Sequence, residues 1–266
     1  MLKQVDFCQV KNYDSGMPIE KCRRCVENQS CESPIANECL PIPVFGDIEQ
    51  SRILVATVGL NPALNEFYQK GELKSESQRL AVLGDYAVTS RLELSDESIA
   101  DAKTRRNNYF RNPVREWHQY FEKFDSLLAR TNPAWSYWQG TAVHIDIVAC
   151  ATKVRWGDLT ARSKAVLIGN CREYLLESLS RLPDGTVVLC DGGQVMQEIA
   201  NCGMRLDMKP VQLINLRTKP TGDAGWIGTL EDAGKRFKVR GWSAYVTHLN
   251  AHWRFDLSHW LRGTLK

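Results

Sequence analysis

The sequence lacks any long run of apolar residues. No stretch approaches the roughly 18 consecutive apolar residues that a membrane-spanning helix needs, and the opening residues MLKQVDFCQVKNYD have no apolar core like that of a secretory signal peptide. We therefore expect a cytoplasmic protein that does not enter a membrane. A large excess of one charge is also missing, because the chain has 34 Lys and Arg residues and 31 Asp and Glu residues. This mildly basic balance permits contact with a polyanion without requiring it.

The cysteine count argues against a disulfide framework. The nine cysteines are an odd number, and in a cytoplasmic protein such a set is more typical of metal ligands and buried thiols. Two residues separate Cys22 from Cys25, a spacing that lets both thiolates face one metal. A zinc ion could be held locally by Cys22, Cys25, Cys31 and Cys39, or an iron–sulfur cluster could recruit cysteines from farther along the chain. Unligated thiols are the third possibility.

The length allows one substantial core with a smaller region attached. A chain of 266 residues with 43% hydrophobic composition can bury an α/β core. We expect a cysteine-rich N-terminal region over residues 1–47, packed on the core, and an α/β domain over residues 48–266. A helical insert is expected within that domain at about residues 67–108.

The first strong feature of the larger domain is a strand followed by a polar turn. Residues 53–58, ILVATV, form an apolar run rich in β-branched residues, typical of a strand buried on both faces of a parallel sheet. Gly59 and Pro62 end the run, and Asn61 lies between them. Ligands in open α/β sheets bind at the carboxyl ends of the strands, so this turn is a candidate site. The alternative is an ordinary strand-to-loop turn.

Further apolar strands alternate with amphipathic helices along the chain. We expect strands at residues 141–152, 186–193 and 211–216, helices at residues 159–183 and 193–204, a glycine-rich basic loop at residues 217–242, and a helix at the end of the chain. Strands that alternate with helices predict a mostly parallel sheet of four or five strands with helices on both faces, a three-layer α/β/α fold.

The order of these motifs resembles the uracil-DNA glycosylase superfamily. VFGD at residues 44–47, a strand, and then Gly-Leu-Asn-Pro at residues 59–62 are similar to the first motif of its mismatch-specific branch. NNYFRNP around Phe110 resembles the segment whose Phe stacks on the extruded base. HIDIVACAT, which contains Asp146, stands in the place of the strand that reads the base edge. VTHLNAHWR, at residues 246–254, resembles the last motif.

The iron–sulfur branches of this superfamily add a second similarity. They have a CxxC motif near the N-terminus, a cysteine just after the base-reading strand, and a cysteine in the next helix. The corresponding residues here are Cys22, Cys25, Cys150 and Cys171. The resemblance therefore implies a 4Fe–4S cluster that joins the N-terminal region to the sheet and has no redox role, with the zinc site as the alternative.

The resemblance implies a monofunctional DNA glycosylase. Such an enzyme extrudes one base from the duplex and hydrolyses its N-glycosidic bond, which leaves an abasic site. Asn61 would hold the attacking water, although an amide is a poor general base, and His248 would donate a hydrogen bond to the leaving pyrimidine. The alternative for His248 is a core or capping histidine. The residues expected to contact the base, besides Asp146, are Phe110, Gly59, Leu60 and Asn250.

Asp146 departs from the superfamily pattern, which has an Asn at the base-reading position. An amide can donate to O4 of uracil, whereas an ionised carboxylate can only accept, and this suits the N4 amino group of cytosine. We therefore expect a cytosine derivative as substrate, such as the glucosylated hydroxymethylcytosine of phage DNA, and a role in antiviral defence. The alternative is a structural Asp146 that pairs with Arg155 or His144.

DNA is the expected partner, with no membrane and no obligate protein partner. We expect His252, Trp253 and Arg254 to contact the duplex and fill the space that the base leaves, and the basic residues of segment 217–242 to contact phosphates. Two other functions stay open. One is excision of uracil or mismatched thymine in base-excision repair, and the other is nucleic-acid binding without catalysis.

Overall fold

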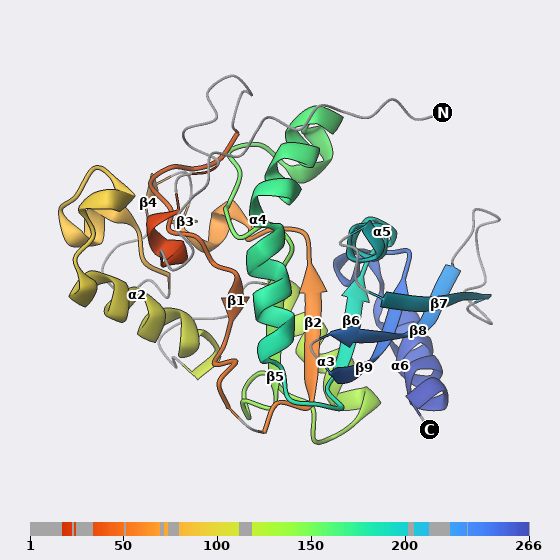
Figure 1. Ribbon diagram of the computed structural model, residues 1–266. Coiled ribbons are helices and arrows are strands. Elements are labelled where there is room, and N and C mark those ends of the chain that lie inside the picture. Colours follow the sequence, from red (N-terminus) through yellow and green to blue (C-terminus); the bar gives the residue numbers. More distant parts are fainter. Residues whose placement is uncertain are drawn as a thin grey trace.

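The central element of the fold is a twisted sheet of seven strands in the order β1-β5-β2-β6-β9-β8-β7 (Figure 1). The computed structural model describes residues 18–22, 24, 34–50, 52–69, 72–73, 80–111, 119–201, 205–212, 224–232 and 234–265. The strands of the sheet are β1 (Val44–Phe45), β2 (Val55–Gly59), β5 (Ala142–Asp146), β6 (Val187–Asp191), β7 (Arg205–Gln212), β8 (Ala224–Asp232) and β9 (Lys235–Trp242).

The strands β5, β2, β6 and β9 run parallel to one another. Every residue of β2, β5 and β6 is buried, as expected for parallel strands that are covered on both faces. The predicted fold class, a mostly parallel sheet within a three-layer α/β/α arrangement, is confirmed. The sheet is larger than the four or five strands predicted, because β1 adds antiparallel to β5 at one edge and β8 and β7 extend the other edge.

Helices cover both faces of the parallel strands. The helices α4 (Ala161–Arg181) and α5 (Gly193–Asn201) pack on one face, and α3 (Gln119–Thr131) and α6 (Ala251–Leu265) pack on the other (Figure 1). Because side chains alternate between the faces of a strand, Val58 and Ile145 point toward α4, whereas Val55 and Ala142 point toward α3. The same alternation places the following polar residues and glycine on the α3 face: Thr57, Gly59, His144, Asp146 and Asp191.

Segment 217–242 is not the loop that the sequence predicted, because residues 224–242 include the antiparallel strands β8 and β9. In β9, Phe237 and Val239 are buried whereas Arg236 and Lys238 are exposed. This alternation is typical of a strand with one covered face. The strand predicted at residues 211–216 overlaps β7 only at its first residues, and residues 213–223 lie outside the described ranges.

The region before β2 and the helical insert both pack on this framework. Ile35 and Val44 belong to the hydrophobic cluster under α4, and Phe45 belongs to the one under α3, so the end of the predicted N-terminal region forms part of the core. The insert contains η3 (Leu83–Tyr86), η4 (Arg91–Glu93) and α2 (Asp96–Asn107), and it forms a small hydrophobic cluster together with Leu40.

Short elements fill the remaining connections. They are η1 (Ile19–Lys21), η2 (Leu64–Glu66), the paired strands β3 (Tyr68–Gln69) and β4 (Glu72–Leu73), η5 (Tyr109–Arg111), η6 (Trp156–Asp158) and η7 (Val246–His248). None of the helices in the described ranges has both the length and the apolar character needed to cross a bilayer.

Candidate active site at the carboxyl ends of the parallel strands

A pocket of about 270 Å³ lies where three neighbouring parallel strands end. Gly59, Asp146 and Asp191 are the last residues of β2, β5 and β6, and all three line it. Ligand sites of open α/β sheets form at this position. The turn after β2 adds Leu60, Asn61, Pro62 and Ala63, and the remaining wall residues are Phe45, Glu66, Tyr120, Phe121, His144, Tyr245 and Thr247.

Asn61 is held in one orientation at the wall of this pocket. Its amide nitrogen donates to the carbonyl oxygen of Pro62 at 3.1 Å and to Thr152 Oγ1 at 3.3 Å. Because both acceptors engage the nitrogen, the side-chain oxygen is the atom left to accept a hydrogen bond from a water or a ligand. The predicted turn residues Gly59, Leu60 and Asn61 are thus brought together with Asp146 in one pocket.

A chain of buried hydrogen bonds fixes one oxygen of Asp146. His144 Nε2 lies 3.2 Å from Asp146 Oδ1, and His144 Nδ1 lies 2.7 Å from Thr57 Oγ1. The Thr57 hydroxyl in turn lies 2.5 Å from the hydroxyl of Tyr137. Every group has a partner when Tyr137 donates to Thr57, Thr57 donates to Nδ1, and Nε2–H donates to the carboxylate, and we assign the His144 tautomer on this basis.

The second oxygen of Asp146 has no such partner. Asp146 is 3% exposed, and its Oδ2 is a buried atom without a hydrogen-bond partner in the part of the chain that the structure describes. Burial raises the pKa of Asp146, and the electrostatic interaction and hydrogen bond with His144 oppose this rise. The alternative of a structural pairing with His144 therefore accounts for Oδ1 only. A buried carboxylate oxygen without a partner is costly, so Oδ2 of Asp146, like the buried Oδ2 of Asp191 in the same pocket, needs a donor from a ligand.

Asp191 is a pocket residue that the sequence analysis missed. It is 1% exposed, and its Oδ1 accepts hydrogen bonds from the indole N–H of Trp242 and the backbone N–H of Val246, both at 2.9 Å. Burial raises the pKa of Asp191 to about 7, although hydrogen bonds from Val246, Trp242 and Tyr120 lower it. The sequence VVLCDGG does place an acidic residue at the carboxyl end of an apolar strand. A polar residue just after an apolar strand was also the reason for predicting Asn61.

Phe110, predicted to stack on the base, does not line this pocket. It is 2% exposed and stacks on Tyr137, with 4.3 Å between ring centroids and 17° between the rings. The aromatic residues that do line it include Phe45 and Phe121, whose ring centroids lie 5.8 Å and 5.1 Å from that of His144. Phe110 lies in η5 and is turned into the aromatic core, so β1 and α3 supply Phe45 and Phe121 to the pocket in its place.

The last predicted motif lies at the rim of the pocket. Tyr245 and Thr247 are wall residues, whereas His248 is exposed and makes an edge contact with the Tyr245 ring at 5.8 Å between centroids. Asn250 is the cap of α6, because its Oδ1 accepts the backbone N–H of Trp253 at 2.9 Å. The structure thus gives Asn250 a capping role and does not place it in the wall.

The predicted DNA contacts in α6 differ in how far they project. His252 is exposed and lies 3.5 Å from Asp256. Trp253 is half-buried and packs on the cluster beneath α6, and Arg254 donates to the carbonyl oxygen of Leu249. His252 is therefore the side chain of this set that is best placed to reach a partner.

Basic residues of β9 have partners within the protein. Lys235 donates hydrogen bonds to carbonyl oxygens at the end of α4, and Lys238 donates one to the carbonyl oxygen of Leu265 at the end of α6. Arg240 is 5% exposed and bonds Thr264. Cations are favourable at the carboxyl ends of helices, so these residues stabilise the fold, and the expectation that they contact phosphates is wrong for Arg240.

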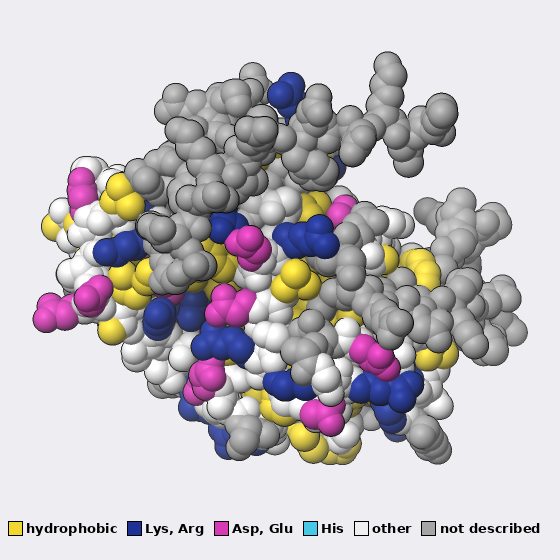
Figure 2. Space-filling view, in the orientation of Figure 1, with side chains coloured by type: hydrophobic (Ala, Val, Ile, Leu, Met, Phe, Trp, Pro, Cys, Tyr) yellow, Lys and Arg dark blue, Asp and Glu magenta, His cyan; other side chains and the backbone are white. Residues whose placement is uncertain are grey.

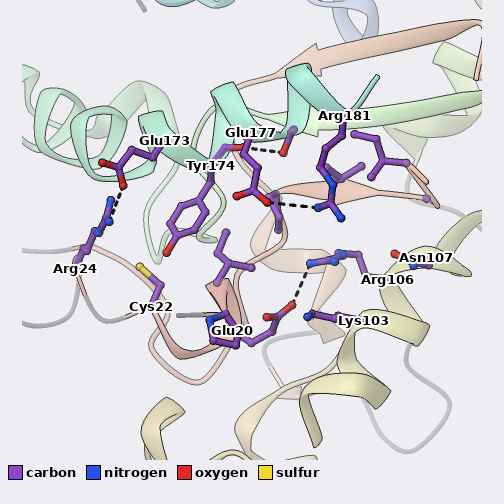
Figure 3. A pocket seen from close by; sticks show the side chains of 17 residues that line it. Glu20, Cys22, Arg24, Lys103, Arg106, Asn107, Glu173, Tyr174, Glu177 and Arg181 are labelled. Atoms are coloured by element: carbon purple, nitrogen blue, oxygen red, sulfur yellow. Dashed lines mark hydrogen bonds and ion pairs between the residues drawn. The ribbon is translucent and has the colours of Figure 1, made fainter. Parts of the chain in front are cut away.

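The predicted metal ligands that are described are all buried, and they share polar neighbours. The Arg91 guanidinium lies among them and donates to the carbonyl oxygens of Cys22 at 3.0 Å and Cys39 at 2.7 Å, and to Cys150 Sγ at 3.7 Å. Tyr174 approaches the Cys22 thiol (Figure 3). The same Arg91 nitrogen thus lies next to both Cys22 and Cys150, and Tyr174 interacts with both Cys22 and Cys171.

The described residues contain no group of three or more His, Cys, Asp or Glu side chains arranged to hold a metal ion. Cys171 is buried in α4, while Cys25 and Cys31 lie outside the described ranges. The structure therefore describes only part of the predicted 4Fe–4S set and only part of the predicted zinc set.

A second cavity, of about 460 Å³, lies between η1, α2 and α4. Figure 3 shows that its charged side chains point toward one another, with Glu20 toward Arg106 and Arg24 toward Glu173. Burial lowers the pKa of Arg106, and the charge of Glu20 opposes this change. These ion pairs connect the segment around η1 to the two helices, so we interpret this cavity as part of the packing of that segment.

The two cavities thus differ in chemistry. The pocket at the strand ends combines the acids Asp146 and Asp191, the amide of Asn61 and two aromatic walls, which suits a flat, polar ring that offers hydrogen-bond donors. The face that carries α4, in contrast, mixes Lys and Arg with Asp and Glu side chains, without a single basic field over its described part (Figure 2). No protein-family model, curated protein or solved structure matches this chain, so its function must be argued from the site itself.

Proposed function

We propose that this protein is a DNA glycosylase that hydrolyses the N-glycosidic bond of a cytosine derivative held in the pocket at the ends of β2, β5 and β6. The observation that carries the proposal is the buried Oδ2 of Asp146, which lines the same pocket as the Asn61 turn and has no partner within the described residues. The sequence resemblance to the uracil-DNA glycosylase superfamily places a water-holding residue and a base-reading residue at these two positions.

The proposed recognition of the base rests on one acceptor and two rings. Because Oδ1 of Asp146 is bonded to His144, the carboxylate offers a single oxygen, which accepts a hydrogen bond from the N4 amino group of cytosine. Phe45 and Phe121 pack against each other, with 5.1 Å between their ring centroids, so together they would form one apolar wall for the ring of the base. A volume of about 270 Å³ lies just below the range of about 300 to 1,000 Å³ typical of ligand pockets, which favours a single base over a larger ligand.

The proposed reaction needs a water beneath C1′ of the extruded nucleotide. The two hydrogen bonds that orient Asn61 both use its amide nitrogen. Its side-chain oxygen would therefore accept a hydrogen bond from that water. His248 is exposed at the rim, and it would reach the leaving base only from the mouth of the pocket. We expect DNA to approach this mouth, and His252, four residues after His248, is also exposed.

The test is base release from defined duplexes. Oligonucleotides that contain uracil, mismatched thymine, cytosine or glucosylated hydroxymethylcytosine are incubated with the protein, and abasic sites are counted after strand cleavage. We expect release of the cytosine derivative, and we expect Asn61→Ala to abolish it. A protein that binds these duplexes and releases no base from any of them would instead be a binding module, which contradicts the proposal.

Uracil is the second candidate substrate, and one observation favours it. Burial raises the pKa of Asp146, and a protonated carboxyl group can donate to O4 of uracil. Excision of uracil should then increase relative to excision of the cytosine derivative as the pH falls. Base release from the two duplexes in competition, measured over a range of pH, separates the two candidates.

A further inference from the structure

Two buried acids flank the Asn61 turn at the ends of the parallel strands. The strand β2 pairs with β5 on one side and with β6 on the other, so Asp146 and Asp191 are separated by two strand spacings. With neighbouring strands about 4.8 Å apart, their backbones lie on the order of 10 Å from each other. Both side chains line the pocket, and the turn that carries Asn61 lies between them.

The surroundings of Asp191 hold its carboxylate in a fixed position. Its Oδ1 accepts two N–H groups, from Trp242 on β9 and from Val246 in the turn before α6. A β-carbon at position 192 would lie 2.6 Å from the Tyr245 ring, and the φ of Gly192 is +105°, a conformation that residues with a side chain rarely adopt. The glycine therefore lets the ring of Tyr245 form the wall beside Asp191.

The groups around Asp191 favour a carboxylate that can take up a proton. The titratable groups that interact electrostatically with Asp191 are Tyr120 of α3, Tyr137, Tyr245 and Cys190. Lys and Arg are absent from the groups that set its pKa among the described residues. A buried acid without a cation is expensive, and an acid of this kind in a pocket is a candidate for proton transfer.

We propose that Asp191 is the general base of the reaction proposed above. It takes a proton from the water that Asn61 holds as the water oxygen bonds to C1′ of the extruded nucleotide. The C1′–N1 bond breaks, and its electron pair leaves with the base, which takes up a proton from solvent to become neutral. Asp191 then returns the water proton to solvent, and the sugar is left with a hydroxyl group at C1′.

This arrangement gives the two acids different tasks. Asp146 is bonded to His144 and reads the base, while Asp191 acts on the water from the other side of the turn. Two carboxyl groups about 6.5 to 9.5 Å apart leave room for a water in glycosidases that act by direct displacement, and the strand spacing here is compatible with such a separation. An acid whose pKa lies near the working pH is also suited to general base catalysis.

The test compares wild type with Asp191→Asn on the best substrate found above. The Asn oxygen can still accept the N–H groups of Trp242 and Val246, so the turn should keep its position. Under single-turnover conditions we expect the rate of base release to fall about 10²- to 10⁴-fold, with DNA affinity changed less than about threefold. The wild-type rate should rise with pH through about 7, because Asp191 must be ionised, and this rise should disappear in Asp191→Asn.

A matched control separates catalysis from positioning. Trp242→Phe removes one donor to the same Oδ1, and because that N–H lowers the pKa of Asp191, the rise in rate should persist and move to higher pH. An unchanged rate or an unchanged pH profile in Asp191→Asn would overturn the role of Asp191 alone. Failure of the wild type to release any base would overturn the proposed function as well, so the two failures are distinguishable.

Discussion

Gly59 and Asp146 are register partners at the ends of β2 and β5, and a β-carbon at position 59 would lie 2.9 Å from Asp146 Oδ1. It would also lie 2.8 Å from His144 Nε2. His144 Nε2 and Asp146 Oδ1 are hydrogen-bonded to each other and belong to buried side chains, so neither side chain can move aside freely. The glycine is therefore required by the close approach of the hydrogen-bonded pair.

Gly59→Ala should weaken both the fold and the site. The added methyl group must displace the His144–Asp146 pair, and we expect a loss of about 1 to 3 kcal/mol in the free energy of unfolding together with loss of base release. Denaturant unfolding measures the first effect. Gly169→Ala is the matched control, because Gly169 is exposed in α4 with no atom within 4 Å of an added β-carbon, and it should stabilise by about 0.5 to 1 kcal/mol. Equal stability of Gly59→Ala and wild type would contradict this account of the contact.

Asp146→Asn should change which base the pocket prefers. The Asn oxygen would accept the Nε2–H of His144 in place of Oδ1, so its amino group would take the place of Oδ2 and present a donor to the pocket. Donation to O4 should then shift the ratio of uracil release to cytosine-derivative release by about 10- to 100-fold toward uracil, since a matched base contact is worth about 1 to 3 kcal/mol. Competition between the two duplexes measures this ratio. Asp146→Ala, which offers neither donor nor acceptor, should lose preference without reversing it, and an unchanged ratio in Asp146→Asn would refute the base-reading role.

The sequence was most informative where burial is complete on both faces of a strand. The strands β2, β5 and β6 are entirely buried, so their sequences are mostly apolar, and only Thr57 and His144 interrupt the apolar runs. Asn61 and Asp146 were predictable for the same reason, because a polar residue at the end of such a run lies at the edge of the sheet where ligands bind.

The residues that the sequence missed depend on contacts far along the chain. Asp191 accepts hydrogen bonds from residues 51 and 55 positions away, and Phe110 is turned from the pocket by its stacking on Tyr137. Such contacts leave no local pattern. The strand β9 was missed for a different reason, because its Lys, Arg and Gly residues outnumber the buried Phe237 and Val239 that mark its covered face.

The ion pair between Glu20 and Arg106 should contribute strongly to stability. Their side chains are 2% and 13% exposed, and Glu20 Oε1 lies 3.2 Å from Arg106 Nη1. Glu20→Ala leaves a buried guanidinium without this partner, so we expect the free energy of unfolding to fall by about 3 to 5 kcal/mol. Glu173→Ala is the control, because Glu173 is 73% exposed where it pairs with Arg24, and its loss should cost less than about 1 kcal/mol. Similar decreases in the free energy of unfolding of the two variants would show that the buried ion pair stabilises the fold no more than the exposed one.

The stability of the protein should also depend on pH through Asp191, whatever reaction the pocket performs. Burial raises the pKa of this group to about 7 in the folded chain, whereas an unfolded Asp titrates near about 3.9. Below the unfolded value the carboxyl group is protonated in both states and its burial costs little. As the pH rises through about 7, the folded state must carry a buried charge, so this contribution to stability is lost.

Asp191→Asn removes that charge and keeps the acceptor for Trp242 and Val246. Relative to wild type, the variant should therefore gain about 2 to 3 kcal/mol in the free energy of unfolding between pH 5 and pH 8. Urea unfolding of both proteins at several pH values gives this difference, and other titrating groups cancel because both proteins share them. A difference that stays constant with pH would mean that Asp191 is already ionised at pH 5 in the folded protein. The pKa of Asp191 would then lie far below the working pH, which removes the argument from pKa for its general-base role. That conclusion would hold even if the variant released the nucleobase slowly.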